Sequence, residues 1–294
     1  MVIKLLHHRE IDLRLWDEVV NQSINFLIYA ESWYLNAVSP EWEALIGGNY
    51  DYLMPLPVKK KFGVKYIVQP VLTQQLGVFS KYDISPETFK KFIAKIPYLS
   101  YEMQLNEKNN FTDVGATRIN LLLDLNLSAN ELQRNFAKNT LRNIAKAKTN
   151  KNSIDRQVNV DDFLEFYRNT ETNDNRANII ITNKLLTNAS KLRRLDIYGI
   201  RDENKKLIAA LCLLKSAKRI INLLPISNEK GKKQFAMFQL IDAVIVDHAG
   251  CEVIFDFEGS MIEGVARFYR GFGAYEVHYP LIKRFRPIFL TGKL

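Results

Sequence analysis

Residues 255–274, FDFEGSMIEGVARFYRGFGA, have the pattern of a strand, a tight turn, a short helix and a second turn. Side chains alternate along a strand, so we expect Asp256 and Glu258 to lie on one face near its carboxyl end. Ligands of open α/β sheets bind outside the carboxyl ends of the strands. The segment therefore predicts a polar ligand site at the turn.

The turn and the helix after it carry local signals that need no chemistry. Gly259 allows a sharp reversal of the backbone, and Ser260 with Glu263 fits a capping box at the helix start. We expect Gly271 to end the helix in the left-handed conformation, with Phe272 packing on the core. The helix is predicted to bury one stripe at helical spacing: Ile262, Val265, Ala266 and Tyr269.

Three side chains of the segment are candidates for catalysis. Glu258 can act as a general base that accepts a proton from an attacking amine, because helix capping does not need it. The alternative is an ion pair with Arg267 or Arg270. Asp256 is a second candidate, with a structural role as its alternative. Tyr269 can protonate a leaving group or pack in the core.

Length and periodicity extend this local pattern to the whole chain. The chain has 294 residues, 47% of them hydrophobic, which allows a sizeable core and two ordinary domains. Periodicity predicts helices over residues 31–38, 85–96, 127–148, 181–192 and 232–250. It predicts strands within residues 42–48, 50–63, 65–79, 195–227, 251–257 and 276–290.

The two halves of the chain share the order helix, hairpin, strand, helix, strand. This similarity favours a tandem duplication, with domains at residues 1–125 and 126–294. Chance recurrence of common α/β elements is the alternative.

The element order and two motifs resemble the GNAT acyltransferase fold and the Fem family of peptidoglycan-bridge aminoacyltransferases. They resemble still more closely the Fem-like acetyltransferase proteins of the GNAT superfamily. The motifs are NTLRNIAKAKTNKNSIDRQVNVDDFLEFYRNT at residues 139–170, and DFEGS followed by FYRGFGA within residues 256–274. The resemblance covers most of residues 125–280 and, more weakly, the first 120. It implies an α/β fold class (α+β, mixed sheet) with two GNAT-like domains in tandem.

The sequence departs from the Fem pattern at two positions. Where those enzymes have Phe-Lys ahead of the terminal Phe-Gly, this chain has Phe268 and Tyr269. Glu258 occupies a position that the family gives to glycine. The missing lysine puts the aminoacyl-tRNA chemistry of the family in doubt, so acyl-CoA (acetyl-CoA) and aminoacyl-tRNA both remain candidate donors.

Positive charge points to a polyanionic partner. The formal charge is +9 and the isoelectric point is near 9.3. Four cations spaced by four residues are predicted to form an anion-binding stripe along one helix, with a solvated face as the alternative: Arg134, Lys138, Arg142 and Lys146.

Two further groups of residues are candidates for substrate binding. The turn before the 232–250 helix corresponds to the pyrophosphate turn of GNAT enzymes, but it lacks most of their glycines. Its donor-binding candidates, with those of the opening segment, are Ser227, Gly231, Lys232, Lys233, Gly259 and Ser260. Candidates for an acceptor cleft between the domains, with edge-strand hydrogen bonding as the alternative, are Gln69, Thr73, Gln74 and Gln75.

Other chemistries lack support in the sequence. The four histidines are scattered without metal-ligand spacing, so we expect no metal cofactor. We expect both Cys212 and Cys251 to be buried reduced thiols. No apolar run approaches the roughly 20 residues that span a bilayer, and the first residues do not resemble a signal peptide, so we expect a cytoplasmic protein without membrane insertion.

The sequence thus predicts an enzyme that transfers an acyl or aminoacyl group to an amine, on a small molecule or a cell-envelope precursor, with tRNA as a further candidate partner. The alternative is a non-catalytic GNAT-fold protein that binds a nucleotide or nucleic acid through its basic surface. Donor, acceptor and oligomeric state are left open by the sequence.

Overall fold

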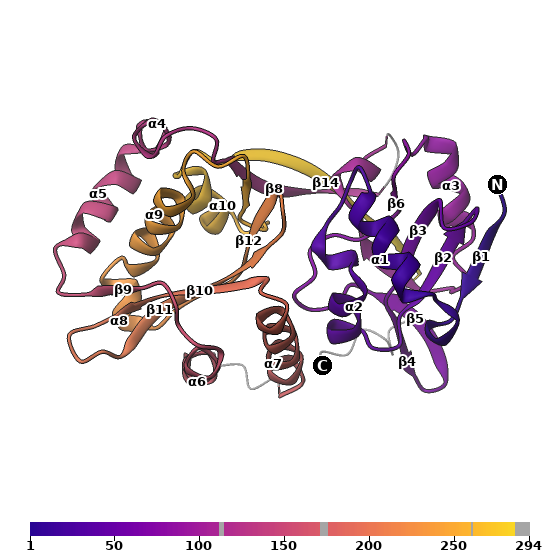
Figure 1. Cartoon of the computed structure of the whole chain (residues 1–294), viewed down its shortest axis with the longest axis horizontal. Coiled ribbons are helices and arrows are strands. Elements are labelled where there is room, and N and C mark those ends of the chain that lie inside the picture. The colour runs from indigo at the N-terminus through magenta and orange to yellow at the C-terminus, as the bar shows by residue number, and fades with distance from the viewer. Residues whose placement is uncertain (112–114, 171–175, 260, 286–294) are drawn as a thin grey trace. The chain divides into compact units, whose positions relative to one another are not determined.

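The computed structural model describes residues 1–111, 115–170, 176–259 and 261–285 (Figure 1). The chain forms two compact units. Unit 1 comprises Met1–Arg118 and the chain from His278 onward, and unit 2 comprises Ile119–Val277. The division into GNAT-like domains at residues 125 and 126 stays a prediction.

In unit 1, strands come before and after the helices along the chain. Its helices are α1 (Leu13–Gln22), α2 (Ser32–Val38) and α3 (Pro86–Ala94), with short 3-10 turns η1 (His8–Glu10), η2 (Ile28–Ala30) and η3 (Glu107–Asn109). One sheet has the order β1 (Ile3–Leu6), β2 (Glu43–Gly47), β3 (Tyr52–Leu56), β6 (Phe79–Ser80). A second run has the order β4 (Val58–Lys61), β5 (Val64–Val68), β7 (Tyr101–Gln104), β14 (Tyr275–Arg284).

Local signals account for several elements of unit 1. The Ser85 side chain accepts the backbone N–H of Thr88 and Pro86 occupies the first turn, so α3 begins where its sequence predicts. Phe62 and Gly63 both have positive φ between β4 and β5, which is the geometry of a tight hairpin turn.

Unit 2 is built around a mixed sheet. Its order is β8 (Ala116–Asp124), β13 (Ile254–Asp256), β12 (Arg219–Ser227), β11 (Leu207–Lys215), β10 (Leu195–Arg201), β9 (Ser153–Asp155). Its helices are α4 (Ala129–Arg134), α5 (Lys138–Lys148), α6 (Val160–Thr170), α7 (Arg176–Lys191), α8 (Glu229–Lys233), α9 (Ala236–His248) and α10 (Glu263–Arg270). β13 pairs in parallel with β12, and the other pairs along this run are antiparallel.

The core of unit 2 lies between its sheet and the helices α5, α9 and α10 (Figure 1). Residues 208–214 of β11 are all buried, which explains the unbroken apolar run of that strand. The same core contains Phe255 and Phe257 from the opening segment and Phe272 after α10. Packing thus places the two ends of residues 255–274 in one apolar cluster.

Two predicted helices are each divided in the structure. The segment 127–148 forms α4 and α5, because the chain leaves the helix at Ala137, whose N–H donates to the carbonyl of Gly271 at 2.9 Å. The segment 232–250 contains only the end of α8 and then α9, with Phe235 between them in the left-handed region at φ 57°. The three strands predicted within residues 195–227 are confirmed as β10, β11 and β12.

Candidate functional site

A gap opens beside β12 where its parallel neighbour ends. The pairing of β12 with β13 begins at Arg219 and ends at Ile221, which lies opposite Asp256. β12 continues to Ser227, and within the described residues this later part is paired with β11 alone. The carboxyl end of β13 therefore lies beside a stretch of β12 with an unpaired edge, which is where a ligand can approach the sheet.

A β-bulge in β12 coincides with this gap. Cys212 on β11 is opposite Leu224, whereas its neighbour Leu213 is opposite Asn222, so Leu223 is the extra residue. Bulges re-aim side chains, and they are frequent next to active sites. Here the bulge follows Asn222, a polar residue that is only 1% exposed.

Asn222 and Tyr269 form a buried polar pair. The Asn222 Nδ2 donates to the Tyr269 hydroxyl at 3.3 Å. The Asn222 Oδ1 is buried and has no hydrogen-bond partner among the described residues, and the same holds for the Ser227 Oγ at the end of β12. A buried polar atom left without a partner costs about 1–3 kcal/mol, so these atoms mark a place where a ligand can supply the missing hydrogen bonds.

Burial sets the protonation state of Tyr269. Its side chain is 5% exposed and packs against Phe257 with ring centroids 4.7 Å apart. Burial raises the pKa of Tyr269 well above the ordinary phenol value, and the negative charge of Glu258 raises it further. Tyr269 therefore holds its proton at neutral pH.

The turn after β13 presents Glu258 in an unusual backbone conformation. Glu258 has φ 58°, in the left-handed region that side chains other than glycine disfavour by about 1–2 kcal/mol. Its backbone N–H donates to the Asp256 Oδ1 at 2.8 Å, and the Asp256 Oδ2 pairs with Arg219 Nη1 at 3.0 Å. Asp256 is fully buried, so it fixes the turn while Glu258 lies partly exposed beyond it.

The prediction that Asp256 and Glu258 share a strand face is wrong. β13 ends at Asp256, and the left-handed backbone at Glu258 breaks the alternation. The alternative of an ion pair with Arg270 has a competitor, because Arg270 pairs with Glu263 and Glu276.

Gly259 has a structural reason to be glycine. Its φ is 53°, and a Cβ there would lie 2.4 Å from the carbonyl oxygen of Ile119 on β8. Ser260, the other donor-binding candidate of this turn, lies outside the described residues. The helix α10 begins at Glu263 with Ile262 as its N-cap residue and no side-chain cap, so the predicted capping box is not its start.

The predicted apolar stripe of α10 is half right. Ala266 and Tyr269 are buried, but Ile262 is 69% exposed and Val265 is 37% exposed. Gly271 is not the left-handed residue either, since its φ is −59°. Its place is instead limited by packing, because a Cβ on Gly271 would lie 2.4 Å from the Thr140 Oγ1.

The turn between β12 and α9 keeps its backbone donors occupied. Gly231 N–H donates to the Asn228 Oδ1 at 2.9 Å, and a Cβ on Gly231 would lie 2.1 Å from the Ile208 carbonyl oxygen. The N–H groups of residues 232, 234 and 235 donate to carbonyls within the same turn. Lys232 pairs with Glu229 at 2.8 Å, and Lys233 is exposed. An anion at this turn would therefore meet lysine side chains more readily than a backbone cradle.

The predicted basic stripe is distributed over two helices. Arg134 ends α4, whereas Lys138, Arg142 and Lys146 lie on the exposed face of α5. The Lys146 Nζ lies 5.6 Å from the ring centroid of Phe235, at the start of α9. The three α5 cations, which we call the α5 basic face, thus lead toward the turn that carries Lys232 and Lys233.

The four acceptor candidates make local hydrogen bonds within unit 1. Gln69 Nε2 donates to the Thr73 carbonyl at 2.9 Å, and its Oε1 accepts the Gln104 N–H at 2.9 Å. Gln75 Nε2 donates to Gln74 Oε1 at 2.7 Å. These bonds are to loops and a neighbouring strand, and the role of the four residues in a cleft between the units stays a prediction.

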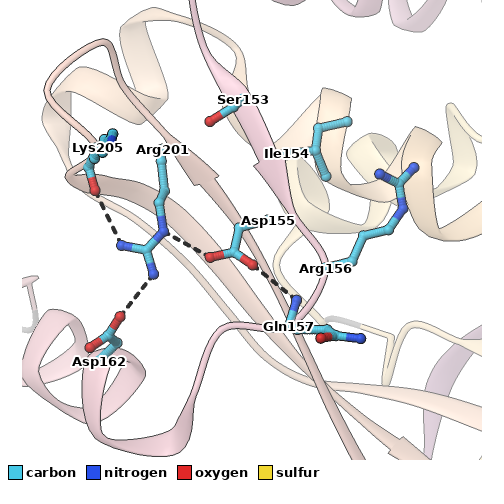
Figure 2. Close-up of a pocket in the computed structure, with 8 residues that line it drawn as sticks. All are labelled: Ser153, Ile154, Asp155, Arg156, Gln157, Asp162, Arg201 and Lys205. Atoms are coloured by element: carbon cyan, nitrogen blue, oxygen red, sulfur yellow. Dashed lines mark hydrogen bonds and ion pairs between the residues drawn. The ribbon is translucent and has the colours of Figure 1, made fainter.

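A second polar region of unit 2 surrounds Arg201 (Figure 2). It lines a depression of about 710 Å³ beside β9. The Arg201 guanidinium donates to Asp155 at 2.8 Å, to Asp162 at 2.8 Å and to the carbonyl of Lys205 at 3.2 Å. Asp155 also accepts the Gln157 N–H at 3.0 Å. We call these residues the Arg201 cluster; it ties β9, α6 and the β10–β11 turn together.

Cysteines and metal ligands add no further chemistry to the part of the chain that is described. Cys212 is fully buried, and burial raises the pKa of its thiol well above the usual range. Cys251 is exposed, contrary to the prediction. Across the described ranges, no cluster of three His, Cys, Asp or Glu side chains could hold a metal ion, and no helix combines the length and apolarity needed to cross a membrane.

Sequence reasoning missed Asn222 and Arg219. The signal for Asn222 was present, since one amide interrupts the apolar run RIINLLPIS of β12. Arg219 opens the same strand, but its pairing with Asp256 could not be read from the sequence because it depends on the register of β12 with β13.

Comparison with solved structures identifies the fold. No family model and no curated protein matches the sequence. The chain is similar to FemX, at 9% identity with a TM-score of 0.65, covering 95% of this chain and 96% of that one. It is similar to a tandem GNAT protein from the clavulanic acid biosynthesis pathway, at 10% identity with a TM-score of 0.51, covering 96% and 98%. It is also similar to L-PGS from Bacillus licheniformis, at 12% identity with a TM-score of 0.50, covering 85% and 86%.

These likenesses extend over nearly the full length of FemX and of the tandem GNAT protein. They confirm the predicted α/β fold class with its mixed sheet. The chain has a Fem-like GNAT fold.

Proposed function

We propose that the protein transfers an acyl or aminoacyl group from an activated donor to an amine. The observation that carries the proposal is the gap beside β12, where the unpartnered Asn222 Oδ1, the protonated Tyr269 and the strained Glu258 turn lie together in a Fem-like GNAT fold. Strained backbone positions cluster at functional sites, and unpartnered buried polar atoms are rare elsewhere.

Glu258 and Tyr269 divide the proton transfers between them. The amine attacks the activated carbonyl, and its proton passes to Glu258 as the new C–N bond forms. When the bond to the leaving thiolate or alkoxide breaks, that group takes a proton from Tyr269. The proton on Glu258 then returns to Tyr269 through solvent. Asp256 and Arg219 act as positioning residues for the Glu258 turn.

The unpartnered acceptor on Asn222 suits a donor molecule with an N–H group beside its carbonyl. The pantetheine arm of acyl-CoA and the amino group of an aminoacyl ester both offer one. The occupied backbone donors of residues 231, 232, 234 and 235 disfavour a pyrophosphate bound by main-chain N–H groups. The exposed α5 basic face supports a donor whose phosphates meet side chains, as aminoacyl-tRNA does.

For the acceptor, the Fem resemblance supports an amine on a cell-envelope precursor or a small molecule. We place the reaction in the cytoplasm, because acyl-CoA and aminoacyl-tRNA are both cytoplasmic donors. A non-catalytic protein that binds nucleic acid through the α5 basic face is the second candidate, and the exposure of that face favours it independently of the gap.

A comparison of two glutamates tests the proposal. Glu258→Gln keeps size and hydrogen bonding but removes basicity, so turnover should fall roughly 10²- to 10⁴-fold in transfer assays with acetyl-CoA and with aminoacyl-tRNA. Glu263→Gln is the matched control, since Glu263 lies nearby on α10 and is bound to Arg270 at the surface. The control should keep the activity of the parent protein.

Two results would contradict the proposal. Equal turnover of Glu258→Gln and the parent protein would remove Glu258 from the chemistry. Absence of transfer from both donors, with salt-dependent binding of tRNA that is lost on replacing Lys138 and Arg142 by Gln, would favour the non-catalytic alternative.

A further inference from the structure

Unit 1 contains a charged pocket that the transfer reaction does not use. Its volume is about 510 Å³, within the range of small-molecule sites. The turn between β1 and η1, the start of β2 and the β4–β5 hairpin all contribute to it. Its charged and titratable lining includes His7, Arg9, Glu43, Lys59, Lys60 and Lys65.

The floor of the pocket is a buried carboxylate whose charge is compensated. Glu43 is 3% exposed, and its Oε1 accepts from Lys65 Nζ at 2.7 Å and from His7 Nδ1 at 2.9 Å. Its Oε2 accepts from the Tyr98 hydroxyl. Burial raises the pKa of Glu43, but these three donors outweigh burial and hold the pKa below the ordinary value. Glu43 is therefore an anchor that orients Lys65 and His7, and it presents no free oxygen to a ligand.

Cations outnumber carboxylates around this floor. The pocket is lined by four Lys and Arg side chains and by two glutamates, of which Glu43 is already paired with Lys65. Arg9, Lys59 and Lys60 form no ion pair with the described residues. The Nδ1–H of His7 is held by a carboxylate, which leaves its Nε2 for the pocket.

The β4–β5 hairpin brings two lysines together. Lys60 lies directly opposite Lys65 in the antiparallel register, and both line the pocket. Like charges directly opposite each other on one sheet destabilise the pair. Glu43 compensates Lys65 only, so an anion beside Lys60 would neutralise the remaining charge of this pair, which is the arrangement expected of a binding site rather than of a fold-stabilising contact.

We propose that this pocket of unit 1 binds a phosphate group, through Lys60 and Arg9, with Lys65 on the same face of the hairpin as Lys60 and held in place by Glu43. A phosphate offers the charge and the several acceptor oxygens that such a set of donors requires. The pocket is larger than one phosphate, so it has room for a further part of a phosphorylated molecule.

The exposed apolar residues at the tip of the β4–β5 hairpin bear on whether the phosphate belongs to a lipid or to a soluble molecule. Phe62 is 82% exposed and Val64 is 47% exposed, next to the lysines. An apolar tip beside cations suits the surface of an anionic membrane, where the phosphate would belong to a lipid headgroup. A soluble phosphorylated molecule would use the pocket without the tip.

Adjacent lysines of the hairpin provide a matched test. Pyrophosphate binding is measured by titration calorimetry, and vesicle binding by cosedimentation with phosphatidylglycerol vesicles. Lys60→Gln should weaken the binding roughly tenfold, because one charge-assisted contact is lost. Lys61→Gln changes the net charge equally at the next position, and Lys61 lies over the Phe62 ring and does not line the pocket. That control should bind nearly as the parent protein does.

The melting temperature separates binding from folding. Because Lys60 faces Lys65, Lys60→Gln should not lower the melting temperature. Phe62→Ser should weaken vesicle binding and spare pyrophosphate binding if the source is a lipid, and it should change neither if the source is a soluble molecule. Equal losses of pyrophosphate binding for Lys60→Gln and Lys61→Gln, or no binding of either probe at low salt, would overturn the proposal.

Discussion

Two polar regions of unit 2 differ in whether their polar side-chain atoms have hydrogen-bond partners. In the Arg201 cluster the guanidinium has partners on three sides, and Asp155 receives a second donor from Gln157 (Figure 2). In the gap beside β12, the Asn222 Oδ1 and the Ser227 Oγ are buried without partners among the described residues. The polar groups of the first region hold elements together, whereas those of the second are the groups that we propose for ligand binding.

Under the proposed function, an open depression with many charges is a poorer guide to the reactive site than unpartnered buried polar atoms. The depression at the Arg201 cluster is the more conspicuous of the two regions, yet its charges neutralise one another. The gap contains a strained glutamate and a buried tyrosine that holds its proton. The two regions therefore differ in whether their buried polar atoms have hydrogen-bond partners.

The largest stability effect should come from breaking the Arg201 cluster. Arg201→Met leaves Asp155 and Asp162 without their cation, so the free energy of unfolding should fall by about 2 kcal/mol, a value reduced for partial exposure. Turnover per folded molecule should not change. Chemical denaturation and transfer assays measure the two quantities.

A neighbouring arginine supplies the control for this prediction. Arg156 lines the same depression and pairs with Asp247 at 2.6 Å, but its side chain is 51% exposed. Arg156→Gln should cost less than about 1 kcal/mol. Equal losses for the two variants would mean that the Arg201 cluster is no more than a surface ion pair.

A double-mutant cycle on Asn222 and Tyr269 should give a smaller effect with the opposite pattern. Asn222→Leu alone leaves the Tyr269 hydroxyl without its donor and should cost about 1 kcal/mol of unfolding free energy. Adding Tyr269→Phe should restore stability to the parent value or above it, because both partners are then apolar. Transfer activity should be lost in both variants. A double variant less stable than either single variant would show that the pair exists for the fold.

The smallest expected effect is a change in the free energy of unfolding at acidic pH. Burial raises the pKa of Asp155, but the Arg201 guanidinium and the Gln157 N–H outweigh burial and hold the pKa below the ordinary aspartate value of 3.8. A depressed folded-state pKa gives stability that is present above the unfolded pKa and is lost as the pH falls through the folded pKa. The stability gap between the parent protein and Arg201→Met should therefore narrow by less than about 1 kcal/mol as the pH falls below 3.8. A gap that stays constant down to pH values well below that point would contradict this assignment.

Elements with strong local signals were predicted correctly from the sequence. Ser85 and Pro86 begin α3, and the charged turn after β10 is closed by Asp202, which accepts the N–H groups of Asn204 and Lys206 at 3.0 Å. The apolar run of β11 predicts a buried strand. The Fem-like GNAT fold followed from the order of such elements and from the motifs in residues 139–170 and 256–274.

The candidate site was predicted only in outline. The sequence pointed to Glu258, Asp256 and Tyr269, but it placed the two carboxylates on one strand face, and it extended one helix through residues 127–148. Both errors have the same origin, since a helical or alternating pattern cannot show where a distant partner ends it. In the predicted helix 127–148, the distant partner is Gly271, because the N–H of Ala137 donates to its carbonyl and not to a carbonyl of the helix.

The sequence by itself determined what acts over a few residues: the start of α3 at Ser85 and Pro86, the charged turn after β10, the apolar strand β11 and the glycine at position 259. The tertiary structure alone decided that β13 stops at Asp256 while β12 continues, that Asn222 meets Tyr269, and that Arg219 holds the Glu258 turn through Asp256. Asn222 and Tyr269 are 47 positions apart in the chain. Contacts at such separations depend on strand register and on packing of the whole core, and no local propensity encodes either of them.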